Sequence, residues 1–234
     1  TIYKTELCYT TDEAFRTTTI PPARATDIKR GTLTDSSYHP IIHGPDNNLY
    51  ILDENFVDKW DGTTYTTSVL NLPNKYTGTC GTNDGNYLVI GGSQAPGQAY
   101  NTETSIVYFW DTWSPDINRK WILSDERLTN VKLGRDGWIY IWTGKGLWKC
   151  TYDDTPQPVL SKTITNVDFT PTYGAIGTWK GMTIWGGGNN GWSLGSPDPK
   201  IPPILQQPLF DSASVTFTAL RSLSPTKVYV GATT

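Results

Sequence analysis

The sequence predicts an all-β protein built from repeated four-stranded antiparallel units. Three observations support this class. Strand-favouring Thr, Val, Ile, Tyr and Trp are plentiful, and Trp alone occurs 10 times in 234 residues. The Ala, Leu, Glu and Lys that long helices favour are comparatively few. A turn followed by a short apolar run recurs along the whole chain, which indicates a repeat architecture.

The recurring unit is clearest in two segments aligned without gaps. "LGRDGWIYIWTG" (133–144) matches "IGTWKGMTIWGG" (176–187) through shared glycine, isoleucine and tryptophan positions. The centres of five such copies are 38 to 52 residues apart, and the other copies span 43–54, 81–92 and 223–234.

Each copy starts with a turn that joins a first strand to an apolar second strand. Asp84-Gly85 and Asp136-Gly137 are the strongest hairpin signals. The apolar runs do not alternate strictly, which is typical of strands that are buried on both faces. These runs lie at 49–52, 87–90, 139–142, 182–185 and 228–230.

Third and fourth strands complete the unit. We expect third strands at 56–60, 106–110, 147–150 and 192–194, and more polar fourth strands such as 64–70 and 119–124. Neighbouring units must cover the apolar faces that a single unit leaves open, as the blades of a β-propeller do. Five copies therefore predict a five-bladed β-propeller that forms a single domain over residues 1–234.

The two ends of the chain together supply one predicted blade. The fifth copy ends at Thr234 after only two strands, whereas "TIYKTELCY" (1–9) matches the third-strand pattern and the polar segment 10–19 follows it. We therefore expect N- and C-terminal strands to share one blade, with residues 1–9 pairing with residues 226–232. This pairing would close the ring and cover a sheet edge.

The predicted architecture resembles that of five-bladed β-propellers over nearly the whole chain. In size and blade number it is similar to lectins of the tachylectin-2 type. The repeats of those lectins are far more regular, so no sugar-binding residue follows from the resemblance.

Composition excludes several kinds of partner. The net charge of -3 and the pI near 5.3 leave no basic surface for nucleic acid. No apolar run is long enough to insert in a membrane. No signal peptide is visible, and the chain starts at Thr1 rather than Met, which is compatible with a removed initiator or leader. The three cysteines, Cys8, Cys80 and Cys150, fit no zinc spacing and are expected to be small packing residues.

Motifs for catalysis or cofactor binding are missing from the sequence. Gly144-Lys145-Gly146 lacks the flanking residues of a phosphate-binding loop and fits a hairpin bend between second and third strands. The glycines of 186–192 fit the equivalent turn. We therefore expect no cofactor and no catalytic residue.

Two sets of potential ligands have simpler interpretations. Asp46, Asp84 and Asp136 occupy equivalent turns, where an aspartate side chain bonds the nearby backbone. His39 and His43 are expected on one strand, on the same face but about 13 Å apart, which is too far for one metal ion. No metal site is predicted.

The tryptophans divide into two groups. Trp142, Trp148, Trp185 and Trp192 fall at repeat positions and are expected to pack between blades. Trp60, Trp110, Trp113 and Trp121 lie near the ends of third or fourth strands, where some can be exposed. Exposed rings beside polar side chains are suited to binding sugars.

Two loops interrupt the repeat and are expected on the same face of the ring, which would make that face the binding side. They are residues 23–37 and 91–103. The candidate ligand-binding residues are Arg24, Lys29, Arg30, Gln94, Gln98, Tyr100 and Trp113.

The sequence thus favours a binding or structural protein at an extracellular or virion surface over an enzyme. Its partner is expected to be a glycan or a protein, recognised through loops on one face. Two alternatives stay open. One is a protein–protein scaffold or decorating subunit of a larger assembly. The other is a glycoside hydrolase with carboxylates in the central funnel.

Overall fold

The structure, a computed structural model, describes the chain with gaps. It covers residues 1–11, 13–20, 26–34, 39–73, 77–94, 104–124, 127–134, 136–144, 146–161, 176–179, 182–185, 191–195, 205–208, 216–224 and 227–233, the last six of these ranges mainly as strands. The chain divides into two compact units, Thr1–Ile122 and Leu123–Thr234.

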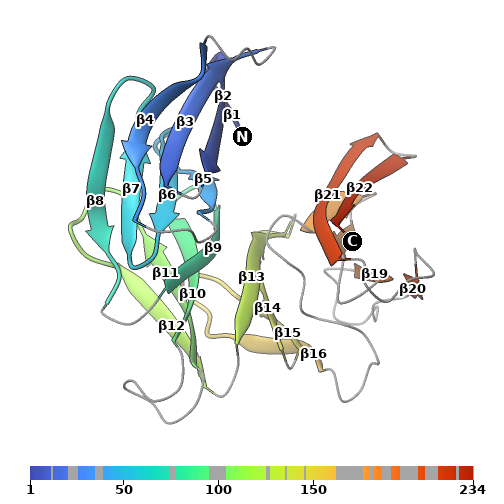
Figure 1. The fold of residues 1–234 in the computed structure, drawn as a ribbon. Coiled ribbons are helices and arrows are strands. Elements are labelled where there is room, and N and C mark those ends of the chain that lie inside the picture. Colours follow the sequence, from blue (N-terminus) through green and yellow to red (C-terminus); the bar gives the residue numbers. More distant parts are fainter. Residues whose placement is uncertain are drawn as a thin grey trace. The chain divides into compact units, whose positions relative to one another are not determined.

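The first unit contains three sheets in which consecutive strands are neighbours (Figure 1). The first sheet comprises β1 (Ile2–Tyr3), β2 (Glu6–Thr11), β3 (Ala14–Thr19) and β4 (Ile28–Thr32). The second comprises β5 (Ile41–His43), β6 (Leu49–Asp53), β7 (Phe56–Trp60) and β8 (Tyr65–Asn71). The third comprises β9 (Thr77–Asn83), β10 (Leu88–Gln94), β11 (Thr104–Trp110) and β12 (Arg119–Ser124), whose end crosses into the second unit.

The second unit repeats the same pattern. One four-stranded sheet comprises β13 (Leu128–Leu133), β14 (Ile139–Thr143), β15 (Gly146–Cys150) and β16 (Gln157–Ser161). The next comprises β17 (Ile176–Trp179), β18 (Met182–Trp185), β19 (Gly191–Gly195) and β20 (Leu205–Pro208). A two-stranded sheet, β21 (Thr216–Ser224) and β22 (Lys227–Thr233), follows. None of the described residues form a helix with the length and apolar character needed to cross a membrane.

The predicted repeat is confirmed for the copies centred on residues 51, 89, 141 and 184, each of which is a four-stranded sheet of propeller-blade topology. The fifth copy forms the expected hairpin, β21–β22. The strand assignment at the N-terminus is wrong, because residues 1–9 contain two paired strands, β1 and β2, instead of one third strand. Residues 10–19 do not form one strand: the chain turns between β2 and β3, which pair with each other.

The number of five blades, the shared blade and the single domain stay predictions. At the N-terminus, β1 pairs with β2, and the Cys8 N–H donates to the Thr1 carbonyl. At the C-terminus, β22 pairs with β21. These contacts arise within each end of the chain.

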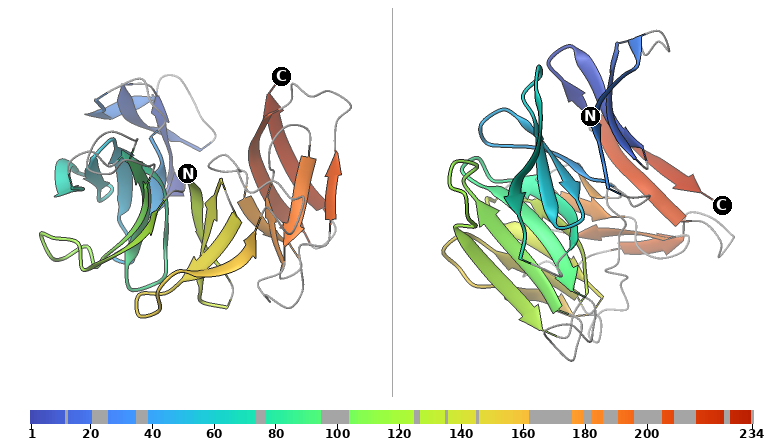
Figure 2. Two further views of the ribbon diagram at one scale, coloured as in Figure 1. Left: turned by 90° about the horizontal axis from the view of Figure 1, so that it is seen from below. Right: turned by 60° about the vertical axis from the view of Figure 1, so that its left-hand side comes forward.

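Strand β6 shows why its sequence is continuously apolar. Leu49 and Ile51 pack in a cluster with residues of the first sheet, whereas Tyr50 and Leu52 pack in a cluster with residues of the third sheet. Successive side chains of a strand point to opposite faces, so both faces of β6 are covered. Figures 1 and 2 show the second sheet beside the first and third in the same unit.

The turns between first and second strands use aspartate as predicted. Asp46 accepts a hydrogen bond from the N–H of Asn48, and Asp84 accepts from the N–H groups of Asn86 and Tyr87. A further repeat feature was not predicted: the Tyr50 hydroxyl donates to Asp46 over 2.8 Å.

The sheet of β13–β16 contains the same hydrogen bond from a tyrosine hydroxyl to the aspartate of the turn, which we call the tyrosine–aspartate clamp. The Tyr140 hydroxyl donates to Asp136 over 2.8 Å, and Asp136 also accepts from the N–H of Trp138. In both sheets a glycine precedes the aspartate by two residues, and a side chain at Gly44 or Gly134 would overlap the clamping tyrosine ring. The motif Gly-x-Asp-x3-Tyr therefore has a packing role, because its glycine leaves room for the tyrosine ring that bonds the aspartate.

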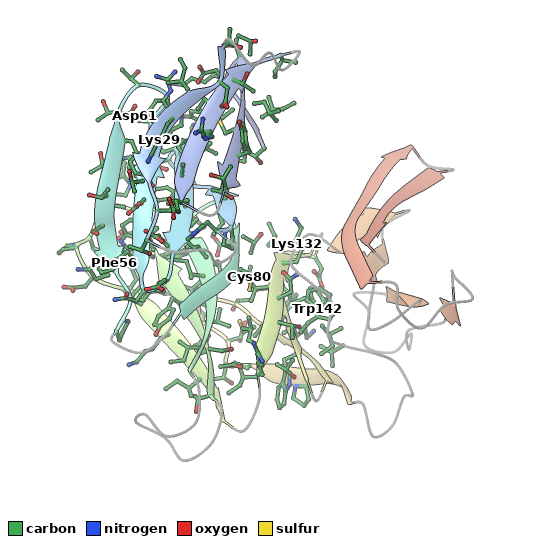
Figure 3. All side chains as sticks on the ribbon, in the orientation of Figure 1. Lys29, Phe56, Asp61, Cys80, Lys132 and Trp142 are labelled. Atoms are coloured by element: carbon green, nitrogen blue, oxygen red, sulfur yellow. The ribbon has the colours of Figure 1, made fainter. Side chains whose placement is uncertain are left out.

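The Gly144-Lys145-Gly146 segment is a hairpin bend, as predicted. β14 ends at Thr143 and pairs with β15, which begins at Gly146. Lys145 and residues 186–190 of the equivalent turn lie outside the described residues. Cys8, Cys80 (Figure 3) and Cys150 are buried and are not joined by disulfides, which confirms their expected packing role.

The tryptophan predictions are confirmed in part. Trp142 is fully buried on β14, and Trp148 is half-buried on β15. Trp60 and Trp110 are buried rather than exposed. Trp185 and Trp192 lie on β18 and β19, and their side chains are outside the described residues.

Candidate ligand-binding site

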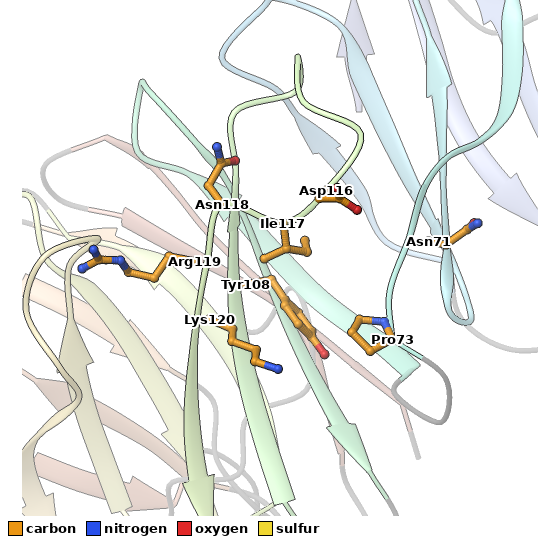
Figure 4. A pocket seen from close by; sticks show the side chains of 8 residues that line it. All are labelled: Asn71, Pro73, Tyr108, Asp116, Ile117, Asn118, Arg119 and Lys120. Atoms are coloured by element: carbon orange, nitrogen blue, oxygen red, sulfur yellow. The ribbon is translucent and has the colours of Figure 1, made fainter.

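A cavity of about 410 Å³ opens in the first unit, beside the end of β8 and the start of β12 (Figure 4). Its walls come from one end of the second sheet and from the connection between β11 and β12, residues 111–118. Eight residues line it: Asn71, Pro73, Tyr108, Asp116, Ile117, Asn118, Arg119 and Lys120. This volume lies within the usual range of small-ligand pockets, roughly 300–1,000 Å³.

The floor of the cavity is apolar and its rim is polar. Tyr108 is fully buried in the cluster shared by the second and third sheets, and Ile117 packs against that cluster. Asp116, Asn118 and Lys120 are exposed. A cavity of this kind can pack the ring of a small polar ligand and meet its polar groups at the rim.

Asp111 organises the first half of the β11–β12 loop. Its carboxylate accepts hydrogen bonds from the N–H groups of Trp113 and Ser114, both over 2.8 Å, and from the Asn118 side chain over 2.9 Å. The Asp111 N–H donates to the Asn118 side-chain oxygen over 2.7 Å. The pKa of Asp111 is lowered to about 2, chiefly by the Ser114 N–H, because these donors stabilise the charged form.

The second half of the loop is hydrogen-bonded to the preceding strand, β11. The Trp110 indole N–H donates to the Ser114 carbonyl over 2.8 Å, and the Ser114 hydroxyl donates to the Asp116 carbonyl over 2.7 Å. The Asn118 N–H donates to the Phe109 carbonyl over 3.0 Å. The loop is thus held at both ends by specific hydrogen bonds.

Trp113 differs from the rest of this ordered loop in its exposure to solvent. It is 85% exposed, the largest exposure among the large apolar side chains of the described residues. The preceding residue, Thr112, has a φ of 69°, so the loop accepts a left-handed backbone conformation immediately before the ring. An indole held in solvent, on the same loop as the lining residues Asp116, Ile117 and Asn118, can stack on a flat apolar surface of a ligand.

The equivalent connection in the second sheet lacks such a ring. In the second sheet, residues 61–64 make a shorter turn in which Asp61 accepts from the N–H groups of Thr63 and Thr64. The aspartate cap is therefore common to both blades, and the connection of the third sheet, residues 111–118, is the longer of the two.

The predicted residues on the first loop are placed differently from the expectation. Residues 28–32 form β4, the edge of the first sheet, so Lys29 and Arg30 lie on a strand (Figure 3). Lys29 is exposed. The Arg30 guanidinium bonds Glu6 over 3.2 Å and Thr17 over 2.9 Å, and lies 5.1 Å from the Trp60 ring centre. Arg30 is therefore engaged in holding the first two sheets together.

Three of the other predicted ligand-binding residues lie outside the described part of the chain: Arg24, Gln98 and Tyr100. Gln94 ends β10, and its side chain is not among those described. The register of β10 with β11 pairs Gln94 with Thr104 and Leu88 with Trp110. Trp113 therefore follows the opposite end of this sheet from Gln94, so the structure does not bring these two candidates together.

A buried polar cluster was missed by the sequence analysis. His39, Asp53 and Asp58 are almost completely buried in the first unit. The His39 Nδ1 atom lies 3.4 Å from an Asp53 oxygen, and both oxygens of Asp53 accept from the Thr34 N–H. His39 precedes β5 rather than lying on it with His43, so the expected pair on one strand is wrong.

The partners of Asp58 suggest an internal structural role. The Tyr65 hydroxyl donates to it over 2.6 Å and the Ser68 N–H over 2.7 Å. Burial raises the pKa of Asp58, and these two hydrogen bonds lower it, which partly offsets the cost of the buried charge. Among the described residues, no group of three His, Cys, Asp or Glu side chains is arranged to hold a metal ion.

Comparison with known proteins supports the fold. No family model matches the chain, and no curated protein matches its sequence. The extracellular domain of a proposed one-component system from B. thetaiotaomicron has a TM-score of 0.71 at 11% identity, over 97% of this chain and 33% of that one. A Bacteroides caccae protein of unknown function has a TM-score of 0.61 at 8% identity, over 96% of this chain and 81% of that one.

A further structure, the extracellular domain of a proposed hybrid two-component system from B. thetaiotaomicron, has a TM-score of 0.53 at 14% identity. It is matched over 94% of this chain and 27% of its own. The chain thus spans about a third or less of the two B. thetaiotaomicron domains. These likenesses define an all-β protein of repeated, propeller-like sheets.

Proposed function

We propose that this chain is a non-enzymatic extracellular binding domain that recognises a carbohydrate through the cavity of the third sheet and Trp113. The observation that carries the proposal is the exposed indole of Trp113, held on a hydrogen-bonded loop that also forms the cavity wall. Sugar rings have apolar faces that stack on aromatic rings and hydroxyls that bind amides and carboxylates. Trp113, Asn118 and Asp116 offer these groups on one loop.

The extracellular location rests on the fold likeness. The solved structures similar to this chain include extracellular domains of proposed signalling proteins. The virion surface, expected from composition as an alternative location, has no support in these likenesses.

The cavity favours binding over hydrolysis. Glycoside hydrolases use two carboxyl groups on opposite sides of the scissile bond. Among the residues that line the cavity, Asp116 is the one carboxylate. The buried carboxylates Asp53 and Asp58 are bonded to neighbouring protein groups and lie outside the set of lining residues.

A glycan array probed with the full chain tests the proposal. We expect binding to a subset of glycans, and Trp113→Ala should weaken it about tenfold, since one stacked ring contributes on the order of 1.4 kcal/mol. The matched control is Ile28→Ala, which removes an exposed apolar side chain from the first sheet and should leave binding unchanged. Absence of binding to every glycan would reject the carbohydrate proposal and favour a protein-binding scaffold.

A further inference from the structure

The cavity has an uneven distribution of charge. Figure 4 shows the ammonium end of Lys120 at the end of the cavity formed by Tyr108 and Pro73, whereas Asp116 lies at the other end. Lys120 is exposed, and none of the ion pairs formed by the described residues includes it. One end of the cavity therefore offers a cation to a ligand.

The neighbouring arginine does not compete for this role. Arg119 precedes Lys120 on β12, so its side chain points to the opposite face of the strand. Its guanidinium lies 5.4 Å from the centre of the Trp121 ring, and Figure 4 shows it directed away from Lys120. The positive charge at the Pro73 end is thus that of Lys120.

From this arrangement we infer that the cavity binds an acidic sugar, with the carboxylate of a hexuronic acid at Lys120 and the sugar hydroxyls toward Asn118 and Asp116. The inference rests on the proposed function, because Trp113 supplies the stacking surface for the same ligand. A lysine binds an anion as a point charge, without demanding one geometry. Asp116, at the far end, accepts hydrogen bonds from hydroxyls and disfavours a second anionic group there.

The size of the preference follows from the exposure of Lys120. An ion pair near the surface contributes at most about 1 kcal/mol, so an acidic ligand should bind about fivefold more tightly than its neutral analogue. Salt screens exposed charges, so the preference should shrink as ionic strength rises.

Two matched probes isolate the charge of the ligand. Tetragalacturonic acid and its methyl-esterified form share the same rings and differ in the carboxylates. Isothermal titration of the full chain at low salt should show about fivefold tighter binding of the acid. Lys120→Gln, which removes the charge and keeps a long side chain, should abolish this preference, and Lys120→Arg should keep it.

Lys29→Gln is the matched control, because it removes the charge of an exposed lysine on the first sheet. It should leave the preference intact. Equal affinity of the unmodified chain for acid and ester, a preference that survives Lys120→Gln, or array binding confined to neutral glycans would each overturn the inference while leaving the proposed function standing. Failure to bind any glycan would instead reject the proposed function.

Discussion

Replacing Ile51 and, separately, Leu52 by alanine tests whether neighbouring sheets cover both faces of β6. The two residues are adjacent, so their side chains point to opposite faces. Both are buried, but Ile51 packs with Trp60 and the first sheet, whereas Leu52 packs with Val57 and the third sheet. A blade with one free face would respond to only one of the two substitutions.

The expected losses are large and similar. Each substitution removes the same number of carbon atoms from a site that is at most 1% exposed. At about 0.8 kcal/mol per buried methylene, plus the cost of the cavity left behind, each should lower the free energy of unfolding by about 3–4 kcal/mol.

Urea denaturation followed by intrinsic fluorescence measures the effect. With a slope of about 2–3 kcal/mol per molar urea, the midpoint should fall by about 1–2 M for both variants. The control is Ile28→Ala, an equivalent truncation at a side chain that is 46% exposed, and its cost should stay below about 1 kcal/mol. If Leu52→Ala costs no more than Ile28→Ala, the two-sided packing of β6 is refuted.

Three further substitutions, one of them a control, probe loops. Asp111→Ala should lower the free energy of unfolding by about 1 kcal/mol at pH 7. This is roughly half of the value that a pKa shift from 3.8 to about 2 would give for a buried group, because the Asp111 carboxylate is largely solvated. The lowered pKa means that the stabilisation is present above pH 3.8 and disappears as the pH falls through about 2, so unfolding curves of variant and parent should converge near that pH. Gly44→Ala should lower the free energy of unfolding by about 1–3 kcal/mol, because the new methyl group overlaps the ring of Tyr50. The control Gly144→Ala should be tolerated, because there is open space around the added atom. Equal losses of stability in thermal melts would contradict the tyrosine–aspartate clamp.

The blade units could be predicted because their signal is local. A strand covered on both faces must be apolar at every position, so 49–52 and 139–142 are visible in the sequence without knowledge of what covers them. The turns before them need aspartate and glycine for equally local reasons. The order of four strands then follows from short connections.

The first sheet could not be predicted in the same way. β1 is two residues long, and β4, with the sequence "IKRGT", is polar at its centre. Such strands form because a neighbour supplies their backbone partners, as β3 does for β4. Local propensity carries little of that information.

The candidate site was predictable only in part. Trp113 was identified because it lies near the end of a predicted strand, where an aromatic ring can be exposed. The cavity, which residues 116–118 of the same loop help to line, also needs Asn71 and Pro73, about 40 residues earlier in the chain, and their proximity arises from the packing of the second sheet on the third. The buried cluster of His39, Asp53 and Asp58 was missed for the same reason.

A comparison of Arg30 with Trp113 shows why the exposure of Trp113 is informative. Arg30 was a candidate from the loop 23–37 and Trp113 from the end of a strand, yet Arg30 is bound by Glu6, Thr17 and Trp60 on its own and the next sheet. Trp113 had an apolar core within the reach of its loop, where Ile117 is partly buried. Because Asp111 fixes the backbone on either side of the indole, the ring stays in solvent as a consequence of the loop's own hydrogen bonds. Its exposure is therefore a property of this hydrogen-bonded loop, and the proposed stacking on a ligand depends on that property.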